Sequence, residues 1–263
     1  MILRKNNFRF VRFIVKNFRL FFYIYSHKIF FWLFVLVFVL QIFFWRIAEK
    51  YRINYDIVSP APSKYFVKGA SFGDEEFLFR VLASRLQNSG DVFAGFVSLK
   101  KYDYSRVYDW MKILDQLNQE SKIAPSLASY YYSQSGNPEQ INYILKYLDE
   151  HSSVDIDKNW WWLFQATFIA KKDLQDLDKS LYFAEKLAKN EAKEAPLWTK
   201  QMPAFISEKK GDGCMAFKVI KNLIDESESG KRQISVEEMN FMRHFINNRL
   251  SKLKNQNFNP QKC

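Results

Sequence analysis

The chain has 263 residues, enough for one domain of ordinary size or two small ones, and 48% of them are hydrophobic. Its formal net charge is +11, but residues 1–46 hold eight of the basic side chains and no Asp or Glu. The rest of the chain carries 31 basic and 28 acidic side chains. A nucleic-acid-binding protein needs a basic face on its folded part, so this distribution excludes nucleic acid as the expected partner.

Residues 1–28 form a basic leader. Five basic side chains in it recur at steps of four, three, four and three residues, which places them on one stripe of a helix. Aromatic and aliphatic residues fill much of the rest, so we expect this leader to lie along anionic lipid headgroups. The alternative is that these charges only set the topology of the next segment. The predicted membrane-surface residues are Lys5, Arg9, Arg12, Lys16 and Arg19.

An almost uncharged segment follows at residues 29–46, where Gln41 is the single polar side chain before Arg46. Seventeen such residues in a helix span roughly 25 Å, close to the hydrocarbon thickness of about 30 Å. Trp32 and Trp45 suit the aromatic belts at the two membrane interfaces. The segment therefore predicts a transmembrane helix.

Two other interpretations of this segment fit less well. A buried core helix rarely holds so many apolar residues on all its faces. A cleavable signal peptide has a shorter leader and small residues at its cleavage site, whereas this segment ends in "FFWRIAEK". We therefore expect an uncleaved, single-pass anchor.

The flanking charges predict the orientation of this anchor. Seven Lys and Arg residues precede it, and Arg46, Lys50 and Arg52 follow it closely. Because the excess lies on the N-terminal side, that side is expected to stay in the cytoplasm. The prediction is an inner-membrane protein whose soluble domain faces the periplasm, if the source is a Gram-negative bacterium.

A proline-containing linker is predicted at residues 47–70, because Pro60 and Pro62 favour an extended spacer. An all-helical soluble domain is then predicted at 71–263. Its first helix lies within "SFGDEEFLFRVLASRLQNSG", with acidic residues in its first turn and Gly90 at its end. We interpret the Asp74–Glu76 acids as helix-start residues and not as a metal or acid/base site.

From Tyr104 onward, apolar-periodic stretches alternate with turn signals, and no strand pattern is visible. The fold class is therefore all-α. Asn137-Pro138 and the acids at 155 and 157 are expected to begin helices, and the glycines at 211 and 213 to separate two of them. Helices are predicted near 104–118, 122–135, 138–150, 158–171, 176–190, 196–209, 213–226 and 235–253.

Alternate helices in this series share a pattern of three face residues, which recurs after 34, 39 and 36 residues. The four sets are Val107, Met111 and Leu114; Ile141, Leu145 and Leu148; Ser180, Ala184 and Leu187; and Ala216, Ile220 and Leu223. A helix pair that recurs near every 34 residues resembles the tetratricopeptide repeat, over roughly residues 104–226. The resemblance is degenerate, because no repeat shows the full Trp/Leu-Gly/Tyr pattern and the spacing drifts.

Single positions add to this resemblance. Ser129 and Tyr132 match the family's small residue followed by an aromatic three positions later, Ala166 and Ile169 match it in part, and Trp198 falls where a first-helix Trp is expected. The whole layout also resembles single-pass bacterial membrane proteins of unknown function. The implied fold is a transmembrane helix followed by an α-solenoid of helical hairpins.

The resemblance implies a groove that holds an extended peptide or a helix of another protein. Packing between helices is the alternative role for its aromatic residues: Tyr132 is expected to pack and Tyr130 to be exposed, and the three consecutive Trp residues cannot all face one core. The partner-binding residues implied by position are Tyr130, Gln134, Trp160, Thr167, Lys171, Trp198 and Gln201.

Catalytic and metal-binding patterns are missing from the sequence. The three histidines are far apart, without metal-ligand spacing, and we expect His151 to act as a cation at a helix end. No phosphate-binding loop, nucleophile elbow or dinucleotide fingerprint occurs. We therefore predict no catalytic residue, no metal and no cofactor.

The two cysteines, Cys214 and Cys263, are expected to be free thiols, because the second is the terminal residue, where fraying disfavours a bridge. A pair could still close in an oxidising compartment.

Two functions fit these features. The leading hypothesis is a non-enzymatic, membrane-anchored module that recruits a protein partner at the cell envelope. The alternative is a structural or assembly subunit that packs permanently into a larger membrane complex. An envelope enzyme with an unrecognised site is a third class.

Overall fold

The structure is a computed structural model of the whole chain. It divides into two compact units, Met1–Tyr55 and Asp56–Cys263. The basic stripe predicted in the leader lies outside the described residues. The described residues are 28–47, 57–92, 95–192, 195–249 and 263.

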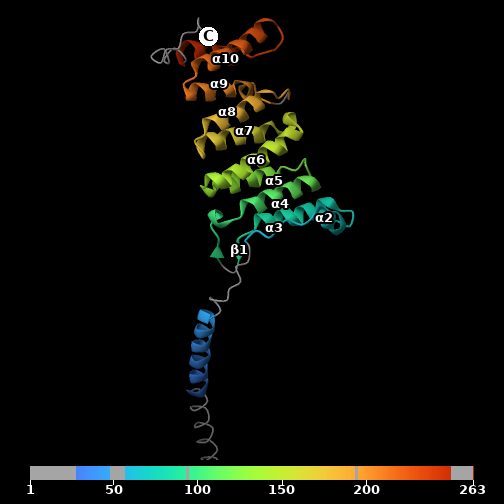
Figure 1. Ribbon diagram of the computed structural model, residues 1–263, viewed down its shortest axis with the longest axis vertical. Coiled ribbons are helices and arrows are strands. Elements are labelled where there is room, and N and C mark those ends of the chain that lie inside the picture. The colour runs from blue at the N-terminus through green and yellow to red at the C-terminus, as the bar shows by residue number, and fades with distance from the viewer. Residues whose placement is uncertain (1–27, 48–56, 93–94, 193–194, 250–262) are drawn as a thin grey trace, which may run out of the picture. The chain divides into compact units, whose positions relative to one another are not determined.

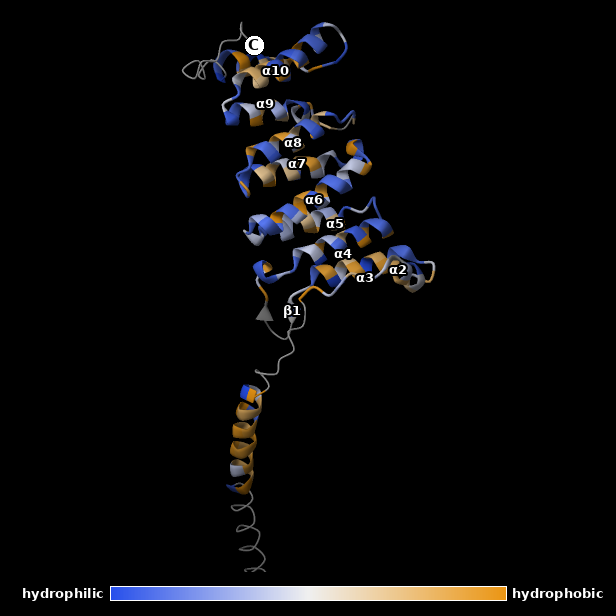
Figure 2. Cartoon of the chain, viewed as in Figure 1, coloured by the Kyte–Doolittle hydropathy of each residue, from blue (hydrophilic) through white to orange (hydrophobic). Residues whose placement is uncertain are grey.

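The first unit contributes one described helix, Lys28–Ile47, which is the apolar segment of the sequence (Figure 2). It begins and ends one residue beyond the predicted bounds, and it is long and apolar enough to cross a membrane. None of its apolar window is buried. A core helix of a soluble protein is mostly buried, so this exposure favours the anchor interpretation over the core helix.

The described part of the second unit is helical, apart from one short hairpin of strands β1, Asp91–Val92, and β2, Gly95–Phe96, which pair antiparallel. Single turns lie at Leu99–Lys101, Leu127–Tyr131, Tyr132–Ser135 and Phe245–Arg249. The helices are α2 Lys64–Ala70, α3 Glu75–Gln87, α4 Tyr104–Leu117, α5 Ile123–Ser126, α6 Pro138–Val154, α7 Ile156–Lys172, α8 Leu177–Ala188, α9 Trp198–Lys210, α10 Gly213–Glu228 and α11 Val236–His244.

The all-helical prediction is confirmed, with two local differences. Helix α2 lies inside the predicted 47–70 linker, because Ser63 caps it: its side chain accepts a hydrogen bond from the Phe66 amide. The β1–β2 hairpin was not predicted. Each strand has two residues, too few for a periodic signal in the sequence.

Local side chains explain where several helices begin and end. The carboxylate of Asp103 accepts backbone hydrogen bonds at the start of α4, and Asp155 does so at the start of α7. Asn137 caps α6 in the same way, with Pro138 in the first turn. Gly211 ends α9 with φ +85°, a left-handed conformation that glycine adopts without strain.

Within the second unit, helices that follow each other in sequence pack on each other from α6 through α10, and α4 packs on both α3 and α6 (Figure 1). All twelve face residues that recur in the sequence are buried, and they lie on α4, α6, α8 and α10. The recurring sequence pattern therefore marks the packed faces of alternate helices.

The buried side chains of this unit form two separate hydrophobic clusters. The larger core runs from Val58 to Leu187 and the smaller core from Ala204 to Phe245. Helix α9 contacts both, because Met202 packs against the larger core while Ala204 belongs to the smaller one.

A disulfide joins Cys214, at the start of α10, to the terminal residue Cys263, with their Cα atoms 5.2 Å apart. The expectation of two free thiols is therefore wrong. Terminal fraying argued against a bridge, but both cysteines pack against the smaller core, which holds the end of the chain in place.

Candidate partner-binding surface

Helix α7 carries three consecutive tryptophans, and the structure separates them. Trp162 is 6% exposed and packs inward, Trp160 is half-buried, and Trp161 is 37% exposed. Successive helical positions differ by about 100°, so three adjacent side chains cannot share one face. Two of the three are therefore accessible to a partner.

The accessible tryptophans belong to a larger group of rings, which we call the aromatic strip. The rings of Trp160 and Trp198 are 6.0 Å apart, and those of Phe164 and Trp198 are 4.8 Å apart, which links α7 to the start of α9. Trp161 packs at an angle on Phe164, at 5.3 Å. The aromatic strip consists of Tyr130, Trp160, Trp161, Phe164 and Trp198.

Tyr130 joins the strip from the turn Leu127–Tyr131, where the chain makes one widened helical turn. Its side chain is 53% exposed, and its Oη accepts a hydrogen bond of 2.8 Å from Trp161 Nε1. Such a turn shifts the register of the following side chains and often occurs at functional sites. The strip therefore presents two exposed rings held together by a hydrogen bond.

The neighbouring Tyr132 has the opposite role. It is fully buried, and its hydroxyl donates to the Leu86 carbonyl at 2.7 Å, which ties this turn to α3. Burial, followed by the nearby Tyr102, raises the pKa of Tyr132. The prediction that Tyr132 packs while Tyr130 is exposed is confirmed.

A groove of about 760 Å³ lies beside the strip. Trp160 and Trp162 form its apolar wall, and charged side chains from the turn after α4 and from the start of α7 line the remainder. Glu120 and Lys158 form an ion pair of 3.1 Å between these two segments. The groove therefore offers an apolar wall and several polar groups, the usual composition of a site for a peptide or small ligand.

The predicted partner-binding residues divide into two sets. Trp160, Trp198, Tyr130, Gln134 and Lys171 are exposed or half-buried, as surface residues must be.

Thr167 and Gln201 are buried, so in this structure they offer no contact to a partner, and this part of the prediction is corrected. Thr167 Oγ1 donates to the Leu163 carbonyl, and Ser180 Oγ donates to the Thr167 carbonyl. The second bond joins the side chain of Ser180 on α8 to the backbone of α7, while the Thr167 side chain bonds within its own helix.

Three further aromatic residues of α7, namely Trp161, Phe164 and Phe168, were not predicted as surface residues. Trp161 and Phe168 are 37% and 45% exposed, and Phe164 is half-buried. Their spacing of three and then four residues is that of one helix face, which was the available signal. The signal was ambiguous because Trp162, Ala166 and Ile169 show a similar spacing on the buried face.

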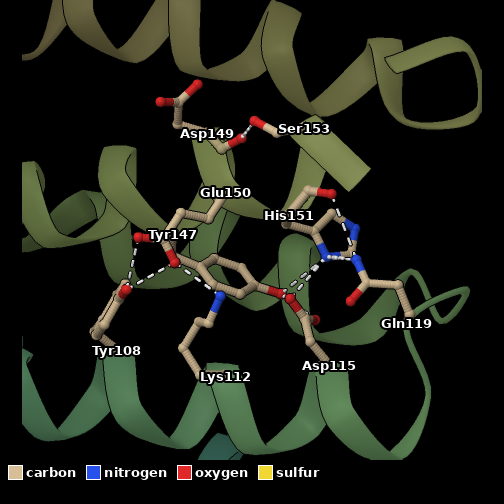
Figure 3. A network of polar contacts seen from close by, with 9 residues as sticks. All are labelled: Tyr108, Lys112, Asp115, Gln119, Tyr147, Asp149, Glu150, His151 and Ser153. Atoms are coloured by element: carbon tan, nitrogen blue, oxygen red, sulfur yellow. Dashed lines mark hydrogen bonds and ion pairs between the residues drawn. The ribbon is translucent and has the colours of Figure 1, made fainter. Parts of the chain in front are cut away.

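A network of polar side chains joins α4 to α6 (Figure 3). Asp115 accepts a hydrogen bond of 2.8 Å from the Tyr147 hydroxyl, and its other carboxylate oxygen lies 3.0 Å from His151 Nδ1. All three side chains are buried, and Gln119 connects His151 to the groove. Burial and then the Asp115 charge raise the pKa of Tyr147 well above its usual value.

His151 lies at a helix end as expected, in the last turn of α6, but it is buried there. Helix α6 continues to Val154, so His151 lies within its last turn, and it is 1% exposed. Its partner is the buried carboxylate of Asp115 and not the solvent-exposed end of a helix. A buried carboxylate, phenol and imidazole that satisfy one another are typical of a packing network.

Two adjacent acidic residues of α6 each accept hydrogen bonds from a Tyr and a Lys on a neighbouring helix. Glu150 accepts hydrogen bonds from Tyr108 and Lys112 of α4 at 2.7–2.8 Å. Asp149 accepts from the Tyr182 hydroxyl and from Lys186 of α8. In Figure 3 Glu150 reaches toward α4 while Asp149 points away from it. The Tyr and the Lys are four residues apart on each helix, so α4 and α8 each present a Tyr and a Lys on one face to α6.

These contacts show that the ionisable side chains around α6 join it to the neighbouring helices. Burial and then the hydrogen bond to Glu150 raise the pKa of Tyr108 to about 12. Among the described residues, no cluster of three or more His, Cys, Asp or Glu side chains is arranged to hold a metal ion. The aromatic strip and its groove are the candidate functional surface, because they combine exposed rings with an open groove.

Comparison of the chain with protein-family models, with curated proteins and with solved structures gives no match.

Proposed function

We propose that this protein is a membrane-anchored helical-repeat module that binds a segment of another protein in the groove beside the aromatic strip. The observation that carries this proposal is the pairing of exposed, mutually supported rings with an adjacent groove. Trp161 donates a hydrogen bond to Tyr130, and Trp160 belongs to the strip and also lines the groove. Tyr and Trp are the usual energetic anchors of protein interfaces.

The repeat interpretation has support from the packing. Helices α4, α6, α8 and α10 begin at residues 104, 138, 177 and 213 and bury equivalent residues at matching positions. A stack of tetratricopeptide-like hairpins buries each hairpin only against its neighbours and leaves an extended surface open. The proposed fold is therefore an α-solenoid of such hairpins after the anchor.

We infer that the N-terminus stays in the cytoplasm and that the helical unit faces the periplasm. Two independent observations support this orientation. Basic residues are concentrated before the Lys28–Ile47 helix. The disulfide between Cys214 and Cys263 needs an oxidising compartment, which a bacterial periplasm provides and a cytosol does not.

The groove indicates the chemistry of the bound segment. Its tryptophan wall suits an aliphatic or aromatic side chain, and its polar groups suit an extended backbone. Asp155 and Asp157 add negative charge at the end where α7 begins, and Lys158 is paired with Glu120. Lys122 offsets one of the two aspartates, so the groove lining carries a net charge of −1. We expect an extended peptide with one apolar anchor residue and a neighbouring basic residue.

The test is crosslinking in membranes, detergent extraction and mass spectrometry on the full chain and on a Tyr130→Ala/Trp160→Ala variant, because Trp160 belongs to the strip and also lines the groove. We expect a defined protein partner whose recovery falls at least about tenfold in the variant, as loss of two aromatic anchors implies. The control is Tyr182→Ala, which removes a ring of similar exposure, 52%, that hydrogen-bonds Asp149 on α6.

The outcomes separate the adaptor function from the subunit function. A partner lost only from the strip variant supports the groove. A partner that both variants retain contradicts it and favours a permanent subunit that packs through another face. The absence of any partner contradicts both.

A further inference from the structure

Among the described residues of the helical unit, the most exposed aromatic side chains lie at its beginning, in the hairpin of α2 and α3. Phe72 is 96% exposed, Tyr65 91%, Phe66 66% and Phe77 64%. Elsewhere in the described part of this unit, large apolar side chains with such exposure are scattered singly, as on ordinary protein surfaces. A concentration of this kind marks a contact surface.

The backbone of the hairpin holds these rings outward. Val67 is the buried side chain of α2, so its neighbours Tyr65 and Phe66 point away from the packed side. Phe72 lies in the turn between the helices with φ +47°, in the left-handed region that bulky residues rarely adopt. A ring placed at the tip of a turn in this conformation, and left in water, contributes nothing to the packing of the unit.

Helix α3 continues the same surface. Its buried face consists of Phe79, Ala83 and Leu86, which pack into the larger core. Phe77 and Val81 are one turn apart and exposed. Helix α3 is therefore apolar on two faces, and the larger core covers one of them.

The position of this hairpin in the chain indicates what covers it. Helix α2 is the first helix described after the Lys28–Ile47 helix, and residues 48–63 connect the two. Val58 already packs in the larger core, so residues 48–57 separate the helical unit from the end of the Lys28–Ile47 helix and span at most about 40 Å when fully extended. A chain anchored by that helix therefore keeps the helical unit within about that distance of the bilayer surface. Confinement of this kind raises the effective concentration of the hairpin at the membrane surface.

We propose that the α2–α3 hairpin inserts its exposed rings into the interface of the bilayer that the anchor spans, as a second membrane contact. Phenylalanine and tyrosine rings are suited to this layer. This inference rests on the membrane anchorage proposed above, and it adds a site that fixes the helical unit against the membrane surface.

The net charge of the α2–α3 hairpin indicates which lipid headgroups it can contact. Residues 64–82 contain three basic side chains and three acidic ones, so the segment is neutral. Glu76 is paired with Arg80 by a 2.8 Å ion pair on the surface of α3. Attraction to anionic headgroups therefore does not drive the contact, and zwitterionic lipid is sufficient for it.

The test places the photoreactive residue p-benzoylphenylalanine at one position at a time in the full chain, reconstituted in phosphatidylcholine vesicles. The positions are Phe66 and Phe72 in the hairpin, Tyr182 on α8 as an exposed aromatic control, and Val37 inside the apolar helix. Mass spectrometry then identifies what each residue crosslinks.

We expect lipid adducts at Phe66 and Phe72 with a yield at least about tenfold above that at Tyr182, because insertion of aromatic rings is strongly favourable. Addition of anionic lipid changes these yields by less than about twofold, since the hairpin is neutral.

Three results overturn the inference. A lipid adduct at Val37 without one at Phe72 shows that the chain is anchored and that the hairpin is not inserted. A crosslink from Phe72 to a second copy or to another protein assigns this surface to a protein. Absence of a lipid adduct at Val37 overturns the anchorage itself, and the inference with it.

Discussion

The two hydrophobic cores of the helical unit differ in how they are held together. The larger core draws on α3, α4, α6, α7 and α8, and buried polar contacts such as the Asp115, Tyr147 and His151 network reinforce it. The smaller core has seven buried residues, from α9, α10 and the end of α11. It has a disulfide from Cys214 to the terminal residue.

This difference follows from the amount of apolar surface that each core buries. A small core leaves much of its surface in water and gains little free energy from burial. A covalent link compensates by restricting the unfolded chain, which is how many small domains outside the cytosol are stabilised. We therefore expect the smaller core to unfold first and to depend on its disulfide.

Loss of the disulfide is the largest expected effect. In the chain-entropy description, a link between residues 49 apart contributes about 4 kcal/mol. Cys214→Ser should therefore lower the melting temperature of α9–α11, so that hydrogen exchange shows these helices open while α4–α8 remain protected. A single unfolding transition in the variant, at the wild-type temperature, would show that the two cores are not separable.

Removal of a buried leucine tests the larger core. Leu148 is fully buried, and Leu148→Ala should reduce the free energy of unfolding by about 3 kcal/mol, through lost burial and the cavity that remains. Urea unfolding followed by circular dichroism measures this. The matched change in the smaller core, Ile220→Ala, should affect only the earlier unfolding transition. If both substitutions affect both transitions equally, the two cores do not unfold separately.

The buried polar network is expected to contribute less. Tyr147→Phe removes the hydrogen bond to Asp115 and leaves a buried carboxylate oxygen without that donor, which costs about 1–3 kcal/mol. Tyr143→Phe, on the exposed side of the same helix, is the control and should change stability by less than about 0.5 kcal/mol. Equal effects of the two changes would show that the network does not stabilise α6 on α4.

The smallest effect is expected at acidic pH. Partial burial raises the pKa of Glu150, but the hydrogen bonds from Lys112 and Tyr108 lower it by more. The pKa of Glu150 in the folded protein is therefore below its ordinary value of 4.5. A carboxylate with a lowered folded pKa stabilises the fold above its unfolded pKa, and this contribution is lost as the pH falls through the folded value.

Glu150→Gln should therefore flatten the decline of stability between about pH 5 and pH 3, measured as unfolding midpoints in urea. The effect is small because Glu150 and Lys112 are partly exposed to solvent. An unchanged decline in the variant would show that other carboxylates set the acid sensitivity.

Much of the helical fold could be predicted from sequence because its signals are local. Asp103, Asn137 and Asp155 act as helix caps within their own segments, and the recurring face residues mark the buried sides of alternate helices. Helix α2 was missed because Pro60 and Pro62 favour an extended linker. Ser63 was the local signal for it, since its side chain caps the helix.

The candidate site could be predicted only in part, because exposure depends on neighbouring helices. Tyr130 is exposed as expected, Trp160 is half-buried and packs partly against the larger core, and Thr167 and Gln201 are buried. In a helix that packs on two sides, periodicity shows which residues share a face, but it does not show which face a neighbour covers.

The sequence by itself determined the segments: one apolar helix long enough to span a membrane, a nearly neutral helical unit, and the helix boundaries set by caps, proline and glycine. The tertiary structure alone decided the pairings between distant residues. It brought Cys263 to Cys214, Asp115 to His151 and Trp198 to Trp160. Local signals act over a few residues, whereas these contacts depend on how complete helices pack, and that packing determines the covered faces and the accessible rings.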